Sequence, residues 1–320
     1  MEQVANFWIW AGFSIFVIIA LGIDTWLAEK KQIGPQSSVR ASLYWTLFWV
    51  ALALIFNLLL LGYLYVTNGP VFAHQSALDF LTGYLIEKSL SVDNLFVFYM
   101  IFHQFRIPVA LQRRVLTYGI WSAVVFRLLF ILLGTYLIAQ FHWLLYLLGV
   151  FLMLTGIKMF FFETKEKDLA QGILFRLLNR IFRLTDEIAE QHFFVKREGY
   201  YFATRLFVAL AFVEISDIIF AFDSIPAIFA ITRDPFIVWT SNIFAILGLR
   251  ALYFCLAGMA DRFNLLKYGV AIILIFVGFK MVIEPWFNVP TVFSLGIVIG
   301  ILLSFIFVSL FRERKNNAAN

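Results

Sequence analysis

Apolar residues in this chain form long, nearly unbroken runs that are separated by polar segments. About 20 consecutive apolar residues, folded as an α-helix, cross the hydrocarbon core of a bilayer. Runs of this length lie near residues 7–27, 43–66, 78–103, 115–138, 143–162, 204–231, 237–258, 266–285 and 290–310. The pattern predicts an all-α polytopic membrane protein with about nine transmembrane helices. We expect these helices to form a single transmembrane domain over residues 1–320.

The basic residues of the polar segments predict how the helices are oriented. Alternate connections, beginning with residues 28–42, are rich in Lys and Arg, whereas the opposite connections carry one basic residue, Arg233. Because cytoplasmic loops hold the excess of Lys and Arg, we expect an external N-terminus and a cytoplasmic C-terminus. This topology signal also explains the net charge of +5, so we expect no nucleic-acid partner.

Composition agrees with a membrane protein and excludes several kinds of site. Charged residues make up 14% of the chain and hydrophobic residues 62%, whereas a soluble domain carries about 25% charged residues. Cys255 is the only cysteine and lies in an apolar run, which excludes a disulfide framework and a thiolate metal site. The chain contains no Gly-x-x-x-x-Gly-Lys-Ser/Thr phosphate-binding loop, so we expect no ATP hydrolysis of that kind.

The connection over 163–203 is the longest polar segment, and the basic residues place it on the cytoplasmic side. Residues 169–183 place apolar side chains on one helical face and arginines on or near the other, as in a helix that lies in the membrane interface. Such a helix could be a lipid-sensing arm, but an amphipathic connector is the favoured interpretation. Residues 192–204 predict a small hairpin around Glu198 and Gly199.

Two of the predicted spans carry acidic residues deep inside an apolar run. One acidic stretch is Glu-Lys-Ser-Leu-Ser-Val-Asp-Asn at 87–94, and the other begins Glu-Ile-Ser-Asp and ends Phe-Asp-Ser-Ile-Pro at 214–226. A carboxylate at this depth costs roughly 2.5–3.5 kcal/mol on insertion scales, so several together require partners or a function. The predicted metal ligands are Glu87, Asp93, Asn94, Asp217 and Asp223, with Ser91, Ser224 and Asn242 as further candidates.

The two acidic stretches belong to an internal repeat. In each stretch two carboxylates lie six residues apart, an arginine follows in the next span (Arg127 or Arg250), and Gly-x-Lys-Met ends the span after that. Each copy holds three spans, and the 163–203 loop returns to the membrane from the side it left. The copies, 78–162 and 204–285, are therefore expected to have opposite orientations. Secondary transporters with this plan bind their substrate near the midplane, between the repeats.

The donor set predicts a hard divalent cation. Carboxylate, amide and hydroxyl oxygens suit Mg²⁺, Ca²⁺ or Mn²⁺, whereas Zn²⁺ and Cu²⁺ favour imidazole or thiolate. Five deep carboxylates against Lys88, Arg127 and Arg250 leave about two negative charges, which such an ion would neutralise. Glu214, which has no counterpart in the first copy, is the predicted proton acceptor. The three basic residues are predicted to balance charge, and Lys88 could equally compete with the cation.

The alternative is that the charges only pair with one another, for instance Glu87 or Asp93 with Arg127, and Asp223 with Arg250. We favour this structural role for the two arginines and a functional role for the carboxylates, which outnumber the basic residues. Asp24 is expected to be solvated at the end of the first span. Lys158 and Lys280 are expected to extend to the membrane interfaces.

Helix geometry limits which of these groups can meet. On an unbroken helix Glu87, Ser91 and Asn94 share a face, while Asp93 lies about 120° away. If all the carboxylates meet at one site, each helix must bend or unwind there. Pro226 supplies a cause in the second copy, because it has no N–H to donate.

The residues assembled so far resemble the TerC family of integral membrane proteins. The strings at 81–94, 214–231 and 240–250 carry the match, and the likeness extends over nearly the whole chain. Length and number of spans are similar to an enterobacterial branch that has been described both as a redox modulator and as a manganese exporter. The resemblance implies Mn²⁺ efflux across the bacterial inner membrane through the acidic residues. The tellurium resistance in the family's older name is not explained by this sequence.

The leading hypothesis is a secondary transporter that exports a divalent cation, with Mn²⁺ favoured by the resemblance, since oxygen ligands alone do not separate it from Ca²⁺ or Mg²⁺. We expect no enzymatic activity and no permanently bound cofactor. The bilayer and the transported ion are the partners that the sequence indicates, and no protein partner can be deduced. One alternative is a redox or tellurite-resistance modulator that acts through a partner. An intramembrane aspartyl protease, with two aspartates sharing a proton, is disfavoured because the Gly-x-Gly-Asp string is absent.

Overall fold

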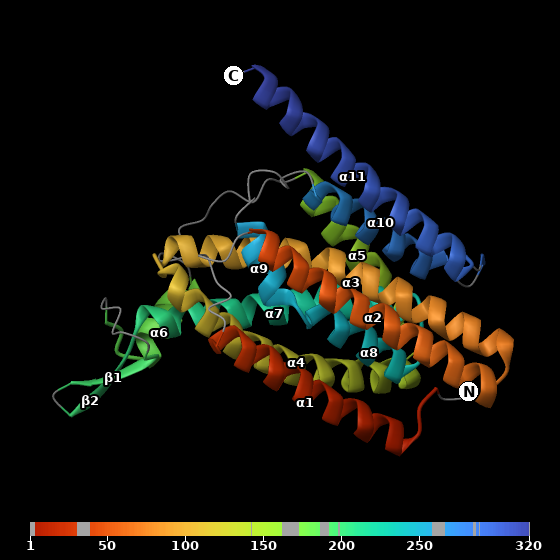
Figure 1. Ribbon diagram of the computed structural model, residues 1–320, viewed down its shortest axis with the longest axis horizontal. Coiled ribbons are helices and arrows are strands. Elements are labelled where there is room, and N and C mark those ends of the chain that lie inside the picture. The colour runs from red at the N-terminus through yellow and green to blue at the C-terminus, as the bar shows by residue number, and fades with distance from the viewer. Residues whose placement is uncertain are drawn as a thin grey trace.

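The structure is a computed structural model that describes residues 4–30, 39–141, 143–161, 173–185, 192–197, 199–257, 266–283, 286–287 and 289–319. Its elements in chain order are α1 (Phe7–Lys30), α2 (Val39–Thr67), α3 (Pro70–Gln104), α4 (Val109–Gln140), α5 (Leu144–Phe161), α6 (Ile173–Ile181), β1 (Phe194–Arg197), β2 (Tyr200–Ala203), α7 (Arg205–Phe229), α8 (Pro235–Ile246), α9 (Leu249–Ala257), α10 (Leu266–Ile283) and α11 (Thr291–Ala319). Figure 1 shows the long helices packed side by side, with α6 and the two strands at one end.

The helical architecture that the apolar runs predict is confirmed, apart from one short hairpin. In the described part of the chain, α1, α2, α4 and α5 are long and apolar enough to cross a membrane, and α8 with α9 would form a fifth span. Helices α3 and α7 are also long, with 35 and 25 residues, but they carry the acidic stretches. The full nine-span topology stays a prediction.

The apolar run over 237–258, predicted as one span, is divided between two helices. The segment forms α8 and α9, which meet at an angle of 41°. Gly248 lies at the break with φ of 80°, a conformation that residues with a Cβ rarely adopt. A Cβ there would also lie 2.5 Å from Cδ1 of Trp49 on α2. The break therefore depends on a glycine within an apolar run.

Pro226, the suggested cause of a bend or an unwound turn, does not interrupt its helix. Helix α7 continues from Arg205 to Phe229 with Pro226 inside it, and α3 is equally unbroken through its acidic stretch. Pro226 lies in the last turns of α7, where the missing N–H disrupts little of the helix that follows. The two carboxylates of each acidic stretch therefore stay on different faces of their helix.

The predicted hairpin is confirmed, and the described part of the amphipathic segment contains the helix α6. Strand β1 pairs antiparallel with β2, and Gly199 has φ of 84° in the turn, while Glu198 lies outside the described residues. Helix α6 covers nine residues, and 169–172 lie outside the described part. Leu177 and Ile181 on α6 are exposed. Figure 1 places α6 beside the hairpin at the end of the bundle.

Helices α5 and α10 touch through their backbones at two points. A Cβ on Gly278 would lie 2.5 Å from the carbonyl oxygen of Gly149, and a Cβ on Gly156 would lie 2.7 Å from that of Ala271. Glycine at these crossings permits backbone contact, as small residues do between membrane helices. The crossings join the last helix of each sequence copy.

We expect Gly278→Ala to destabilise the protein by about 1–3 kcal/mol, because the added methyl group forces two packed backbones apart. Thermal unfolding of the purified protein in detergent measures the effect. Gly296→Ala on α11 is the matched control, since a Cβ there meets nothing within 4 Å. An equal loss of stability in both variants would contradict the close crossing.

Candidate functional site

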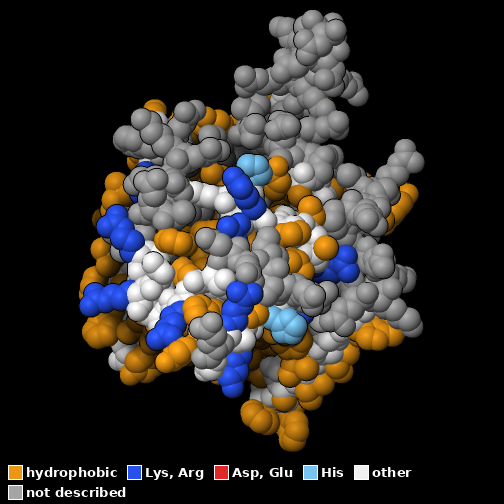
Figure 2. All heavy atoms as spheres, turned by 90° about the vertical axis from the view of Figure 1, so that its left-hand side faces the viewer, with side chains coloured by type: hydrophobic (Ala, Val, Ile, Leu, Met, Phe, Trp, Pro, Cys, Tyr) orange, Lys and Arg blue, Asp and Glu red, His pale blue; other side chains and the backbone are white. Residues whose placement is uncertain are grey.

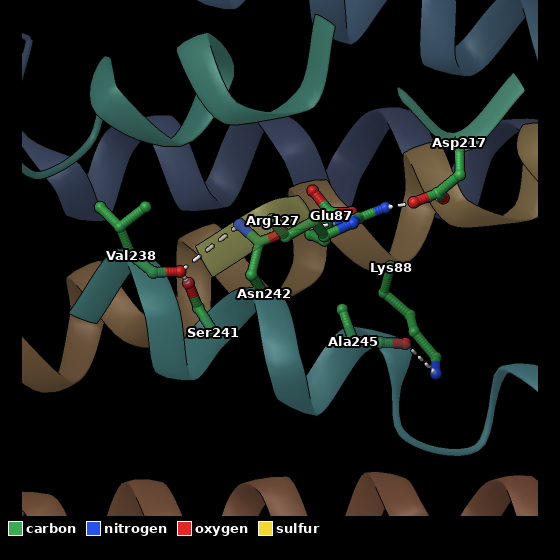
Figure 3. A network of polar contacts seen from close by, with 8 residues as sticks. All are labelled: Glu87, Lys88, Arg127, Asp217, Val238, Ser241, Asn242 and Ala245. Carbon is green, nitrogen blue, oxygen red and sulfur yellow. Dashed lines mark hydrogen bonds and ion pairs between the residues drawn. The ribbon is translucent and has the colours of Figure 1, made fainter. Parts of the chain in front are cut away.

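A single buried arginine joins the two acidic stretches. Arg127 on α4 donates from Nη1 to Oε1 of Glu87 on α3, and its Nη2 lies 3.4 Å from Oδ1 of Asp217 on α7. Nη1 also donates to Oδ1 of Asn242 on α8, at 2.6 Å. Figure 3 shows these side chains converging from four helices. The structure thus brings together one predicted ligand from each sequence copy, one predicted charge-balancing residue and one further candidate ligand.

Helix packing explains why these side chains meet. Helix α3 packs against α7 and α8, and α4 packs against the same two helices. Gly83 lies one turn before Glu87, and a Cβ there would lie 3.0 Å from Oγ of Ser241. This close approach of α8 to α3 places Asn242 beside Arg127. Glu87 and Asn242 have no exposed surface and Arg127 is 2% exposed, so the network is shielded from solvent.

Lys88 points away from this network. Its Nζ donates to the carbonyl oxygen of Ala245, at 3.1 Å, as Figure 3 shows. In a continuous helix that carbonyl would accept from the N–H of Leu249, but the break between α8 and α9 removes this partner. Lys88 therefore stabilises the broken helix through a buried hydrogen bond.

Glu214 lies one turn before Asp217 on α7 and contacts a different partner. Its Oε1 accepts a hydrogen bond from the hydroxyl of Ser122 on α4. The sequence analysis missed Ser122, because a lone serine in an apolar span carries no distinguishing signal. Glu214 thus lies close to the central network without a direct ion pair among the described residues.

Several buried oxygens around the network lack a hydrogen-bond partner among the described residues. They are Oε2 of Glu87, Oε2 of Glu214, Oγ of Ser91 and Oγ of Ser224. Buried polar atoms are normally satisfied, and carboxylate and hydroxyl oxygens are the donors that hard divalent cations prefer. Glu87 and Ser91 lie one turn apart on α3, so they share a face of that helix.

The remaining predicted ligands are Asn94, Asp93 and Asp223, and the structure describes the side chain of Asn94 alone among these three. Asn94 is buried on α3. Asp93 and Asp223 lie on α3 and α7, and their side chains are outside what the structure describes. In the described part of the chain, no group of three His, Cys, Asp or Glu side chains is arranged to hold a metal ion.

Arg250 is not part of the central network. Its Nε donates to Oδ2 of Asp24 on α1, at 3.0 Å, and its Nη1 donates to Oγ1 of Thr117 on α4, at 2.6 Å. Asp24 is 5% exposed, so the expectation that it is solvated is wrong. The suggested pairing with Asp223 stays a prediction, because the side chain of Asp223 lies outside the described part of the chain; the described partners of Arg250 lie on α1 and α4.

A second polar cluster lies at the start of α3. Oδ1 of Asp79 accepts from Nε2 of Gln75 at 2.8 Å and from Oγ1 of Thr291 on α11 at 3.1 Å. Lys280 is 7% exposed, so the prediction that it extends to the interface is wrong, while Lys158 is exposed. Asp79 was not singled out from the sequence, because its partner Thr291 on α11 is 212 residues away in the chain.

Comparisons with known proteins agree with the resemblance noted above. Residues 72–317 match the model of the "Integral membrane protein TerC family". The chain is 50% identical over 303 residues to Alx of Escherichia coli (strain K12), covering 95% of this chain and 94% of that protein, which is named as a candidate membrane-bound redox modulator. It is 46% identical over 306 residues to the uncharacterized membrane protein STKORF319 of Myxococcus xanthus, covering 96% and 93% of the two chains. No solved structure matches.

Proposed function

Because this chain belongs to the TerC family of integral membrane proteins, we propose that it is a secondary transporter that exports a divalent cation, with Mn²⁺ as the first candidate, across the bacterial inner membrane. The observation that carries the proposal is the buried Arg127, which bridges Glu87 and Asp217. Ionisable residues inside membrane proteins mark ion pathways and proton relays. In this proposal the chain has no enzymatic activity and no resident cofactor.

The balance of charge supports a cation as the substrate. Arg250 is neutralised by Asp24, so its charge does not balance the acidic stretches. Lys88 and Arg127 are then the basic residues left to count against the five carboxylates of the two stretches, which leaves three formal negative charges. A buried charge without a partner is strongly unfavourable. The excess of carboxylates is therefore larger than the sequence alone indicated, and a divalent cation would compensate most of it.

Arg127 acts in this proposal as an internal cation that exchanges with the substrate. Its guanidinium pairs with Glu87 and Asp217 when no ion is bound and offsets one of their two charges, while the partnerless oxygens of Glu87 and Ser91 are available as ligands for an arriving ion. Binding of the cation would release Arg127 from the carboxylates. Asp93, Asn94, Asp223, Ser224 and Asn242 are the further proposed ligands. Positions 93 and 223 lie on other faces of α3 and α7 than Glu87 and Asp217, so in this proposal the two helices bend or unwind there when the ion binds.

The inverted repeat is a further part of the proposal. The α5–α10 crossing supports it, because Gly149 and Gly156 are seven residues apart, as are Ala271 and Gly278. Gly149 meets Gly278, and Gly156 meets Ala271. Equivalent positions therefore make reciprocal contacts, as expected for two copies related by a pseudo-two-fold axis in the membrane plane. The external N-terminus and cytoplasmic C-terminus belong to the same proposal.

Glu214 is the proposed coupling residue. It lies one turn from Asp217, forms no ion pair with Arg127, and has one buried oxygen without a partner among the described residues. A carboxylate in such a setting can carry a proton in exchange for the ion, as acidic residues do in other pumps and transporters.

The names of the similar proteins favour a second candidate, a membrane redox modulator. The chain contains one cysteine, Cys255, so it cannot form a disulfide within itself. A redox role would therefore depend on a partner protein or a bound group. Tellurium resistance would likewise be a consequence of another activity.

The function can be tested in cells by expressing the wild-type chain or Asp223→Asn in a strain that lacks its own manganese exporters. We expect the wild type to lower total cell manganese during Mn²⁺ exposure, and Asp223→Asn to leave it as high as an empty vector does. Asp223 lies in the second acidic stretch, so this substitution removes a proposed ligand of the ion. Equal manganese content with wild type and with empty vector, at equal membrane levels of the protein, would argue against export.

A further inference from the structure

Ser122 on α4 places its hydroxyl among three acceptor oxygens, where α4 packs against α7. Its Oγ lies 2.9 Å from the carbonyl oxygen of Tyr118 and 3.0 Å from that of Gly119. The third acceptor is Oε1 of Glu214 on α7. A hydroxyl has one hydrogen to donate and two lone pairs that accept. Ser122 therefore donates to one of these oxygens at a time and can still accept a hydrogen bond.

Gly119 gives the carboxyl group of Glu214 room beside α4. A Cβ at Gly119 would lie 3.3 Å from Cγ1 of Val213 and 3.8 Å from Oε1 of Glu214. The missing side chain thus lets α7 lie close against this turn of α4. Ser122 follows three residues later, on the same side of the helix. Gly119 provides the space for the carboxyl group, and Ser122 provides its hydrogen bond.

Glu214 differs from the two carboxylates of the Arg127 network in having a neutral partner. Glu87 and Asp217 form ion pairs with Arg127, and a guanidinium can donate hydrogen bonds but cannot accept them. A protonated carboxyl group needs an acceptor for its O–H. The hydroxyl of Ser122 can both donate and accept, so it is a partner for either form of Glu214.

The geometry allows two hydrogen-bond patterns without movement of a side chain. With Glu214 ionised, Ser122 donates to Oε1 of Glu214. With Glu214 protonated, the carboxyl group donates to Oγ of Ser122, whose own hydrogen turns to the carbonyl oxygen of Tyr118 or Gly119. Each O–H has an acceptor in both patterns, so neither protonation state incurs the cost of an unpaired donor.

The charged groups nearest to Glu214 come from three helices. Asp217 lies one turn further along α7, Arg127 reaches Asp217 from α4, and Glu87 on α3 pairs with the same arginine. Of the other helices packed against α7, α8 carries no charged side chain, and the described charges of α5 and α10 are Lys158 and Lys280, each in the last turn. The structure gives Glu214 no ion pair with any of these described groups.

Glu214 is also more accessible than the carboxylate at the centre of the network. Glu214 and Ser122 are half-buried, whereas Glu87 has no exposed surface. Figure 2 shows Lys and Arg but no described Asp or Glu on the end of the molecule that carries α6 and the hairpin. Glu214 therefore lies deeper along the bundle, at the contact of α4 with α7, where a membrane-soluble reagent can reach it.

We propose that Ser122 is a positioning residue for proton exchange at Glu214. Its hydroxyl keeps the carboxyl group hydrogen-bonded in one place, both with and without a proton. The inference rests on the proposed function, in which Glu214 carries a proton in exchange for the ion. An arriving proton binds Oε1 of Glu214, and its departure returns the hydrogen bond of Ser122 to that oxygen.

Labelling with dicyclohexylcarbodiimide tests the proposal, because this membrane-soluble reagent modifies protonated carboxyl groups. The purified full-length protein in neutral detergent is treated at a series of pH values, and peptide mass spectrometry measures the modified fraction at Glu214. In the wild type we expect labelling to fall as the pH rises. Ser122→Ala should raise the midpoint by about one pH unit, because it removes the donor to the ionised form, which is the stronger of the two hydrogen bonds.

Three further variants separate the hydroxyl from a general effect of substitution. Ser122→Thr keeps the hydroxyl and should keep the wild-type midpoint, whereas Ser122→Cys, with a weaker donor, should lie between wild type and Ser122→Ala. Ser216→Ala is the matched control, since Ser216 on α7 donates to the carbonyl oxygen of Phe212. We expect this variant to label as the wild type does.

Equal midpoints in wild type and Ser122→Ala would overturn the proposal. An equal shift in Ser122→Thr or Ser216→Ala, or no labelling of Glu214 at any pH, would also overturn it. Labelling does not depend on transport. The expected shifts in a protein that gives no Mn²⁺ flux would therefore support the role of Ser122 and count against Mn²⁺ export.

Discussion

Replacement of Glu87 or Asp217 by its amide is expected to abolish Mn²⁺ transport while the protein still folds. Each carboxylate forms an ion pair with Arg127 in the structure and is a proposed ligand of the ion. Loss of an outer-shell partner of a metal site costs about 10–100-fold in affinity, so loss of a direct carboxylate ligand should cost at least about 100-fold. The amide keeps the shape of the side chain, and Arg127 keeps its other carboxylate. Uptake of ⁵⁴Mn²⁺ into inverted membrane vesicles measures the effect.

Asp79→Asn is the matched control for these two variants. Asp79 is a buried carboxylate on the same helix as Glu87, but its partners are Gln75 and Thr291. We expect this variant to transport Mn²⁺ with little change in apparent affinity. Full transport by Glu87→Gln and Asp217→Asn, with protein levels equal to wild type, would show that the bridged carboxylates only stabilise the fold.

The second large effect is expected from Arg127→Met, which should make the stability of the protein depend on divalent cations. Without the guanidinium, Glu87 and Asp217 are left buried and unpaired, and breaking a buried pair in this way costs about 3–5 kcal/mol. A cation that binds the same carboxylates should restore about 2.7 kcal/mol at a concentration 100 times its Kd. Unfolding in detergent, with and without Mn²⁺, measures both parts of the prediction.

Arg250→Met provides the comparison that identifies the site. It also breaks a buried ion pair, with Asp24, so a similar loss of stability is expected. Only one described carboxylate contacts Arg250, and Mn²⁺ should therefore not rescue this variant. If Mn²⁺ rescues both variants to the same degree, it binds somewhere other than the carboxylates of Arg127. If it rescues neither, Arg127 is not the group that the substrate displaces.

The helices and the outline of the site could be predicted from the sequence because apolar periodicity and buried charge are local signals. The apolar runs predicted the helices, and turn residues predicted the β1–β2 hairpin. The sequence also suggested Glu87 or Asp93 as a partner for Arg127, and the structure pairs Arg127 with Glu87. The acidic stretches are also local signals, so the family could be recognised from them.

What could not be predicted depends on contacts between distant segments. Gly248 breaks its helix because of its backbone conformation and because Trp49 packs against it. That bend turns Arg250 toward Asp24, 226 residues away in the chain, and frees the carbonyl group that Lys88 binds. Pro226 was the stronger local signal for a break, yet α7 continues through it. The break at this one glycine thus determines the partners of Arg250 and Lys88, two of the three predicted charge-balancing residues.

The central claim is that the chain alone carries Mn²⁺ through the carboxylates that Arg127 bridges. The most direct test is to reconstitute the purified protein into liposomes that contain a Mn²⁺-sensitive dye and to impose a Mn²⁺ gradient. We expect saturable Mn²⁺ entry with the wild type and with Asp79→Asn, and entry no faster than in protein-free liposomes with Glu87→Gln. Folded wild-type protein that gives no flux above protein-free liposomes, with or without a proton gradient, would contradict the account.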